Sequence, residues 1–180
     1  MNGRANNLID CFPPVADGKA TVLILGSMPG KESLKQNHYY AHPQNTFWKI
    51  MGKLVGAHPH LPYEECLRKL TDARIALWDV LASCERKSSL DVHIRNEQAN
   101  DFVTFFAQHP RITHVFFNGT KAEQSFNKFV SELQQLPPLT FQRLPSTSPA
   151  HAGMSYADKL KAWNSVTRGR PFSNHTRPTS

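Results

Sequence analysis

Two asparagines stand where a carboxamide could do chemistry. Asn45 lies in the polar and aromatic segment Tyr39–Trp48, and Asn118 directly precedes Gly119. A carboxamide both donates and accepts hydrogen bonds, so it could hold a water molecule or recognise the polar edge of a ligand, although it is a poor general base. Each asparagine also has an ordinary structural interpretation. Asn45 fits the N-cap of a helix, and an Asn-Gly pair is typical of a turn.

The cysteines give no sign of a metal or redox site. Cys11, Cys66 and Cys84 are odd in number and far apart, and no pair has CxxC spacing. We therefore expect reduced thiols, with neither a zinc nor an iron–sulfur site, and we expect no cofactor. His42 could act as a base in principle, but its place between Ala41 and Pro43 favours a role in orienting the loop.

Composition narrows the class of protein. The chain has 180 residues, a formal net charge of +7 and a pI of about 9.5, a balance that suits a polyanionic partner. Its apolar runs are shorter than the roughly 20 residues of a membrane helix, and its first residues lack the basic-then-apolar order of a signal peptide. We therefore expect a cytoplasmic protein that does not bind membranes.

Strands and helices are expected to alternate along the chain. Short apolar segments rich in β-branched or aromatic residues predict strands at Thr21–Leu25, Ile75–Val80, Ile112–Phe117 and Leu139–Leu144. Apolar residues at helical spacing predict helices after Asn45 and at Tyr63–Asp72, Gln98–Gln108, Thr120–Leu136 and Ser155–Val166. This alternation predicts a three-layer α/β/α sandwich with a central, mostly parallel four-stranded sheet.

Ligands of such sheets bind beyond the carboxyl ends of the strands. The loops expected there are Gly26–Pro43, Leu81–Ile94, Asn118–Lys121 and Pro145–Gly153, and they should converge on one cleft. We expect a single domain over residues 21–167. Residues 1–20 are expected to form a lead-in segment, and residues 168–180 a disordered basic tail.

Three of these loops carry motifs that resemble one family. They are Gly26-Ser27-Met28-Pro29-Gly30, Tyr39-Tyr40-Ala41-His42-Pro43-Gln44-Asn45-Thr46-Phe47-Trp48 and Ser146-Thr147-Ser148-Pro149-Ala150-His151. Together they resemble the signature motifs of the uracil-DNA glycosylase superfamily, and most closely its hypoxanthine-DNA glycosylase branch. Trp78-Asp79-Val80 and Ser88-Ser89-Leu90-Asp91 are similar to that branch as well, so the resemblance covers roughly residues 20–165. It implies a base excision repair enzyme that flips a deaminated base out of DNA and hydrolyses its bond to the sugar.

The chain departs from most of the superfamily at two catalytic positions. Met28 stands where other branches carry Asn or Asp, and Ser146 stands where several carry His or Asn. The hypoxanthine branch shows the same loss and places its catalytic asparagine between the His-Pro and Phe-Trp pairs. The resemblance therefore implies that Asn45 positions the attacking water, which the helix cap does not exclude.

The resemblance also implies how the base is held. Asn118 would read a carbonyl oxygen and an adjacent ring N–H, which hypoxanthine and uracil both present. Tyr40 would stack on the base, whereas Tyr39 is expected to be structural, because consecutive residues of an extended chain point in opposite directions. The backbone of Gly26, Ser27 and Met28 would line the pocket.

The last motif is expected to contact DNA. Ser146, Ser148 and Pro149 would lie on a loop in the minor groove, where small hydroxyls suit phosphate contacts. Ala150 stands where relatives carry a larger wedge residue, and it would fill the vacated stack poorly. His151 is equally well interpreted as a phosphate contact or as a solvated loop histidine.

Further residues are expected to support the site without reading the base. His42, Ser89 and Asp91 would brace the pocket or contact the opposing strand, although Ser89 or Asp91 would serve equally well as a helix cap. Basic side chains on loops at the same sheet edge are candidates for phosphate contacts, namely Lys31, Lys35, Arg86, Lys87 and Lys121.

The expected substrate is deoxyinosine in DNA, with uracil or xanthine as further candidates, and the enzyme is expected to be a monomer. No lysine of the core motifs suits a Schiff base, so simple hydrolysis is expected. Two alternatives remain open. One is a methyltransferase that uses Gly26–Gly30 as a cofactor loop and Asp79 to bind ribose. The other is a DNA-binding module without catalysis.

Overall fold

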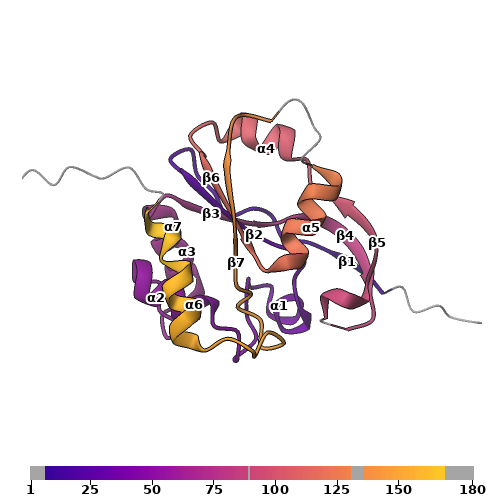
Figure 1. Ribbon diagram of the computed structural model, residues 1–180, viewed down its shortest axis with the longest axis horizontal. Coiled ribbons are helices and arrows are strands. Elements are labelled where there is room, and N and C mark those ends of the chain that lie inside the picture. Colours follow the sequence, from indigo (N-terminus) through magenta and orange to yellow (C-terminus); the bar gives the residue numbers. More distant parts are fainter. Residues whose placement is uncertain (1–6, 89, 131–135, 169–180) are drawn as a thin grey trace, which may run out of the picture.

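The protein is described here from a computed structural model, which defines residues 7–88, 90–130 and 136–168. A four-stranded parallel sheet forms its centre, in the order β3 (Ile75–Asp79), β2 (Val22–Gly26), β6 (His114–Asn118) and β7 (Thr140–Leu144). All four strands lie close to the expected segments, and the predicted α/β fold is confirmed. Figure 1 shows this sheet between two layers of helices.

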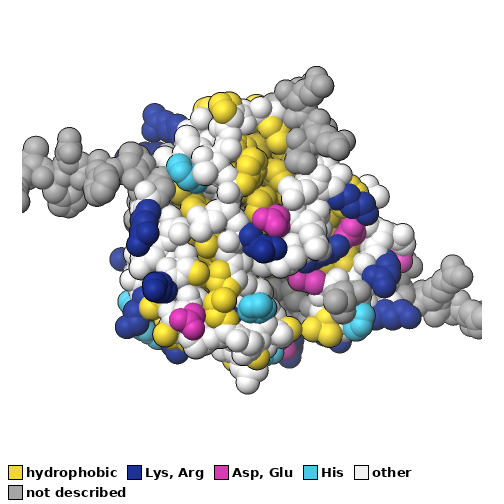
Figure 2. All heavy atoms as spheres, in the orientation of Figure 1, with side chains coloured by type: hydrophobic (Ala, Val, Ile, Leu, Met, Phe, Trp, Pro, Cys, Tyr) yellow, Lys and Arg dark blue, Asp and Glu magenta, His cyan; other side chains and the backbone are white. Residues whose placement is uncertain are grey.

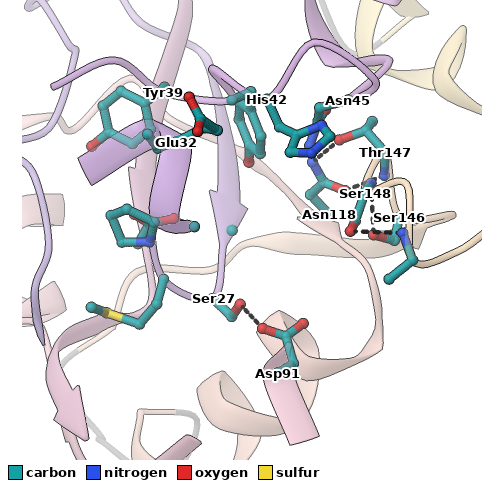
Figure 3. Close-up of a pocket in the computed structure, with 18 of the residues that line it drawn as sticks. Ser27, Glu32, Tyr39, His42, Asn45, Asp91, Asn118, Ser146, Thr147 and Ser148 are labelled. Atoms are coloured by element: carbon teal, nitrogen blue, oxygen red, sulfur yellow. Dashed lines mark hydrogen bonds between the residues drawn. The ribbon is translucent and has the colours of Figure 1, made fainter. Parts of the chain in front are cut away.

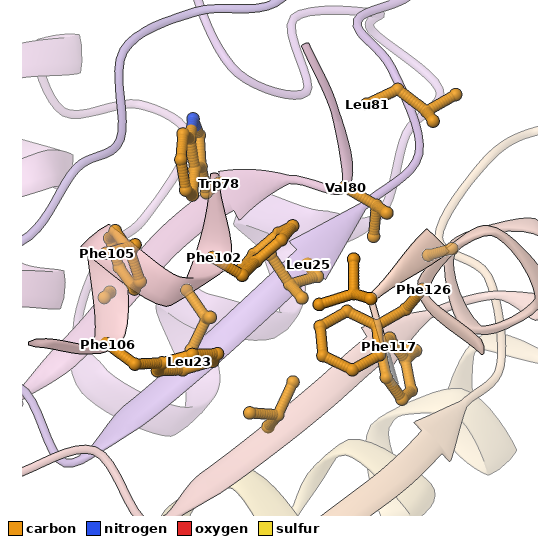
Figure 4. Close-up of a cluster of buried hydrophobic side chains, with 14 of the residues drawn as sticks. Leu23, Leu25, Trp78, Val80, Leu81, Phe102, Phe105, Phe106, Phe117 and Phe126 are labelled. Atoms are coloured by element: carbon orange, nitrogen blue, oxygen red, sulfur yellow. The ribbon is translucent and has the colours of Figure 1, made fainter. Parts of the chain in front are cut away.

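Helices cover both faces of the sheet, and the strands β2 and β3 are buried throughout, whereas the edge strand β7 exposes every residue except its last. Every residue of β2 is buried, and alternate residues point to opposite sides. Val22 and Ile24 pack against one layer, formed by α2 (Phe47–Val55), α3 (Tyr63–Asp72), α6 (Tyr156–Trp163) and α7 (Ser165–Arg168). Leu23 and Leu25 pack on the other side (Figure 4) against aromatic residues of α4 (Phe102–Gln108) and α5 (Thr120–Phe129).

A second, antiparallel sheet was not expected from the sequence. It joins β1 (Leu8–Asp10), β4 (Leu81–Arg86) and β5 (Ile94–Ala99) in the order β1-β4-β5. The prediction that residues 81–94 form a loop was therefore wrong. The first part of this segment is the strand β4, and the short helix η1 (Asp91–His93) follows it. The strand β1 lies in the lead-in segment, where Ile9 pairs with Cys84.

Several helix boundaries also differ from expectation. The segment predicted as a loop after Gly26 contains a short helix, α1 (Lys31–Gln36). The helix α4 begins only after Asp101, whose carboxylate accepts a hydrogen bond from the Thr104 backbone N–H and so caps the helix. Gln98, which was expected to begin this helix, belongs to β5 instead. Ser155 caps α6 in the same way. The predicted end of α5 falls partly on residues 131–135, and the basic tail on residues 169–180, outside the described residues.

The carboxyl ends of the parallel strands share one edge. Gly26 is in register with Asp79, and Asn118 is in register with Leu144. The segments that follow these residues therefore begin beside one another, as the topology of a parallel sheet requires. Within the described residues, no helix has the length and apolar character needed to cross a bilayer.

Candidate active site

A cavity of about 620 Å³ opens at this edge of the sheet. It is lined by the segment after β2, the segment before α2, the end of β3, η1 and the segment after β7 (Figure 3). It brings together nearly all residues that the sequence singled out, namely Gly26, Ser27, Met28, Tyr40, His42, Asn45, Asp91, Asn118, Ser146, Ser148, Pro149 and Ala150. Its size suits a single nucleobase with part of its sugar.

Asn45 holds the start of α2 and also lines the cavity. Its Oδ1 accepts a hydrogen bond of 3.0 Å from the Phe47 backbone N–H, but the N-cap of α2 is Thr46, so Asn45 supports the first turn from the residue before the cap rather than as the expected N-cap. The next residue, Thr46, donates its backbone N–H to the Thr147 carbonyl over 3.1 Å, which joins this segment to the loop after β7. An amide oxygen has two lone pairs, so the hydrogen bond from Phe47 leaves one of them available for water.

Asn118 is held in one orientation by Thr147. The Asn118 Oδ1 accepts from the Thr147 backbone N–H over 3.0 Å, and its Nδ2 donates to Thr147 Oγ1 over 2.9 Å. Figure 3 shows both side chains beside Asn45 on one wall of the cavity. Thr147 is only 1% exposed, and sequence reasoning gave it no role. Its place between two small hydroxylic residues gave no signal that it would be the buried one.

The two tyrosines of the second motif differ in their surroundings. Tyr39 is buried, and its hydroxyl donates to the Pro13 carbonyl over 2.9 Å, which fits the structural role expected for it. Tyr40 has a positive φ of 54°, and its ring stacks on Phe47 with 4.1 Å between ring centroids. Because Phe47 covers one ring face, only the opposite face of Tyr40 remains for a base.

Asp79 is a second lining residue to which the sequence analysis gave no role in this site. Its carboxyl is 3% exposed, and burial together with the negative charge of Asp91 raises its pKa to about 7, against the opposing effect of the Arg86 guanidinium. The sequence signals were its place at the end of an apolar strand and in the segment Trp78-Asp79-Val80, and neither indicated a role in this cavity.

Ser27 and Asp91 brace the opposite wall. Ser27 Oγ donates a hydrogen bond of 2.6 Å to Asp91 Oδ1, as Figure 3 shows. This bond ties the first motif to η1, so the bracing role expected for Asp91 has a structural basis. The accompanying expectation for Ser89 concerns a residue outside the described ranges. His42 is exposed, and its Nδ1 accepts from the Gln44 backbone N–H, as expected of a residue that orients the loop.

The two serine hydroxyls of the last motif accept hydrogen bonds within their own loop. Ser146 Oγ accepts from the Ser148 backbone N–H, and Ser148 Oγ accepts from the Ala150 backbone N–H, both over 3.2 Å. These bonds shape the turn at the mouth of the cavity and leave Ala150 exposed. His151 is also exposed but does not line the cavity, and Lys159 donates to its carbonyl oxygen.

The basic residues proposed as phosphate contacts differ in their surroundings. Arg86 was predicted wrongly, because it is 4% exposed and its guanidinium donates to the Pro29 carbonyl instead. Lys121 forms an ion pair with Glu97, whereas Lys31, Lys35 and Lys87 lie at the surface. Figure 2 shows Lys and Arg side chains spread over the viewed face, with fewer acidic ones among them. The positive charge is therefore distributed over this face.

Comparison with known proteins gives matches along most of the chain. A family model described as the uracil DNA glycosylase superfamily matches residues 13–167. Proteins named hypoxanthine DNA glycosylase from Methanosarcina barkeri and Methanosarcina acetivorans are 38% and 39% identical over 112 residues, 62% of this chain and 71% of each relative.

A solved structure agrees with the sequence matches. The solution NMR structure of a uracil DNA glycosylase candidate from Methanosarcina acetivorans is 32% identical, with a TM-score of 0.75 over 89% of this chain and 97% of that one. Because the family match runs from residue 13 to residue 167 and takes in every strand of the parallel sheet, the chain belongs to the uracil-DNA glycosylase superfamily.

Proposed function

We propose that this protein is a monofunctional DNA glycosylase that removes hypoxanthine from deoxyinosine in DNA. The observation that carries the proposal is the placement of two carboxamides, Asn45 and Asn118, in one cavity at the carboxyl edge of the sheet. Relatives that are 38–39% identical bear the name of this activity. The proposal includes action on DNA as a monomer in the cytoplasm, by a domain of residues 21–167.

The proposed reaction begins when the damaged nucleotide leaves the helix. Flipping costs a few kcal/mol, and less at a mismatch such as inosine opposite thymine. The extruded base stacks against Tyr40, while the loop Ser146–Ala150 contacts the strand. Asn118 then offers its second N–H to the base oxygen and its second lone pair to the adjacent ring N–H. Adenine carries an amino group in place of that oxygen and is rejected.

Hydrolysis follows through a cation-like sugar. The Asn45 carbonyl holds a water molecule and directs its lone pair at the anomeric carbon. Because an amide is a weak base and Met28 cannot activate water, the reaction depends strongly on how readily the base departs. Xanthine and uracil share the carbonyl and N–H pair that Asn118 reads, so they are the further substrates to examine.

The test is base release from duplexes that contain deoxyinosine, deoxyuridine or deoxyxanthosine, followed by strand cleavage in alkali. We expect cleavage with deoxyinosine and its loss in Asn45→Ala. The matched control is Asn164→Ala, the same chemical change at an exposed residue at the end of α6. Retained DNA binding without cleavage of any duplex would instead favour a module that binds DNA without catalysis.

A further inference from the structure

The carboxyl of Asp79 is a buried polar group of the cavity that the mechanism above does not use. The backbone of Asp79 is held by Asn100, whose Nδ2 donates a hydrogen bond of 2.8 Å to the Asp79 backbone carbonyl. Its side chain is 3% exposed and lines the cavity, and Oδ2 has no hydrogen-bond partner among the described residues. An unpartnered carboxyl is costly to bury, so it calls for an explanation beyond folding.

Gly26 gives this carboxyl its place in the cavity. Gly26 and Asp79 are register partners on neighbouring strands, and a Cβ at position 26 would lie 2.6 Å from Asp79 Oδ1. The same Cβ would lie 2.9 Å from the buried Tyr40 hydroxyl, which interacts with Asn118 and with the charge of Asp79. The Asp79 carboxyl, whose Oδ2 lacks a partner among the described residues, and the Tyr40 hydroxyl therefore meet beside Gly26, where a bound base could contact them.

The charges around Asp79 come from several elements. Asp91 on η1 disfavours ionisation of Asp79, and Arg86 on β4 favours it, while Tyr39, Tyr40 and Cys11 are the other titratable groups that interact with it. Burial is the largest influence and raises the pKa of Asp79 to about 7. The carboxyl therefore still carries its proton in a substantial fraction of molecules at neutral pH.

We propose that Asp79 is a catalytic residue that donates its carboxyl proton to a ring nitrogen of the departing purine, N7 or N3. The inference rests on the proposed function and adds a leaving-group acid to it. It also bears on base choice. Hypoxanthine presents ring nitrogens with free lone pairs, whereas uracil in DNA has one nitrogen bonded to the sugar and the other bonded to hydrogen. Proton donation to a ring nitrogen therefore favours purine substrates.

The step balances as a hydrolysis. The bond between the sugar carbon C1′ and purine N9 breaks, and its electron pair stays with the base. The proton of Asp79 moves to the ring nitrogen, so the base leaves neutral. The oxygen of the water held by Asn45 forms the new bond to C1′, and the proton that this water loses returns through solvent to the Asp79 carboxylate. The products are free hypoxanthine and an abasic site.

The test compares single-turnover base release by the wild type and Asp79→Asn between about pH 5 and about pH 9. The amide keeps the shape of the carboxyl but has no proton to give. We expect the wild-type rate on deoxyinosine to fall above about pH 7, approaching tenfold per pH unit. Asp79→Asn should be slower by about 10²-fold at low pH and nearly flat across the range.

A second variant tests the same idea while Asp79 stays in place. Asp91→Asn removes the neighbouring negative charge that raises the pKa of Asp79. The midpoint of its pH profile should therefore move to lower pH than in the wild type. The amide oxygen of the substituted residue can still accept the hydrogen bond from Ser27. A contribution of Asp79 to folding alone would not shift this midpoint.

Modified substrates identify the acceptor atom. The wild type should be slow on either 7-deaza- or 3-deaza-deoxyinosine, and Asp79→Asn should add no further loss on that analogue. Equal rates of folded Asp79→Asn and wild type would overturn the inference alone. An unmoved midpoint of the Asp91→Asn pH profile would overturn it as well. So would an equal loss of rate by Asp79→Asn on deoxyinosine and on both deaza analogues. A wild type that releases no base would overturn the proposed function, and this inference with it.

Discussion

Asn118 and Thr147 are joined by two hydrogen bonds that use both ends of the carboxamide. The Thr147 backbone N–H donates to Oδ1 over 3.0 Å, and Nδ2 donates to Thr147 Oγ1 over 2.9 Å. These bonds determine which end of the amide is oxygen and which is nitrogen, and they leave one N–H and one lone pair. The base reading proposed for Asn118 would therefore depend on a loop that follows a different strand.

The first prediction separates these two contributions. Asn118→Ala removes the groups that read the base, so release of hypoxanthine should slow by about 10²-fold, with weakened discrimination against adenine. Thr147→Val removes only the hydroxyl acceptor and keeps the backbone N–H, so it should lower the rate but preserve the discrimination. Rates on deoxyinosine and deoxyadenosine duplexes measure both effects. Unchanged discrimination in Asn118→Ala would refute base reading by this residue.

The second prediction concerns the two roles of Asn45. Asn45→Ala should lower the rate by about 10²-fold because water loses its positioning group. It should also lower the free energy of unfolding by about 1 kcal/mol because the Phe47 N–H loses its acceptor. Asn45→Asp keeps an acceptor and should restore stability and part of the rate. Single-turnover rates and urea unfolding of the three proteins distinguish the roles. A wild-type rate in Asn45→Ala would exclude the catalytic one.

Three strands of the parallel sheet were predictable because each is an apolar segment that ends in Gly26, Asp79 or Asn118. The fourth, β7, is a weaker case because four of its five residues are exposed. The antiparallel sheet was not predictable, because β5 contains Asn96, Glu97 and Gln98, which favour strands weakly, and only half of β4 is buried. Such strands form because their partners position them. The pairing of β1 with β4 therefore could not be inferred from local pattern.

The site, like the fold, was predictable from the sequence only in part. Asn45 and Asn118 belong to motifs that can be recognised in the sequence, and the fold brings them to one cavity. The surroundings of Asp79 could not be predicted, because its burial depends on Gly26 in a neighbouring strand and on charges from β4 and η1. The burial of Arg86 was missed for the same reason, since its carbonyl partner lies beyond another strand.

The third prediction is a pH-dependent gain of stability in Asp79→Asn. The pKa of Asp79 rises from 3.8 to about 7 on folding, so the folded protein binds this proton more tightly than the unfolded chain. The resulting stabilisation is complete below about pH 4 and is lost as the pH rises to about 7. The loss amounts to up to about 4 kcal/mol, because one pKa unit corresponds to about 1.4 kcal/mol.

Asn at position 79 does not titrate, so the variant should gain on the wild type between these pH values and keep a constant advantage above them. Urea unfolding at a series of pH values measures the difference. Asp72→Asn, which removes an exposed carboxyl at the end of α3, is the control for loss of one acidic group. A difference between Asp79→Asn and wild type that does not change with pH would contradict the assignment of a raised pKa to this residue.

The fourth prediction follows from the exposure of Ala150 at the cavity mouth. An alanine is too small to fill the space that a flipped base leaves in the stack, so the duplex can close again before hydrolysis. Ala150→Leu should hold the base out longer and raise the rate on duplex DNA severalfold. The gain should be largest for inosine opposite cytosine, where flipping opposes a stable pair.

Single-stranded DNA supplies the internal control for this variant. It has no opposing base to re-pair with, so Ala150→Leu should leave its rate nearly unchanged. Because residue 150 is exposed, the larger side chain requires no rearrangement of the core, and unfolding should match the wild type. Met154→Ala, a change at an exposed residue farther along the same loop, controls for a general effect of surface apolarity. Equal gains on single and double strands would show that Ala150 does not act as a wedge.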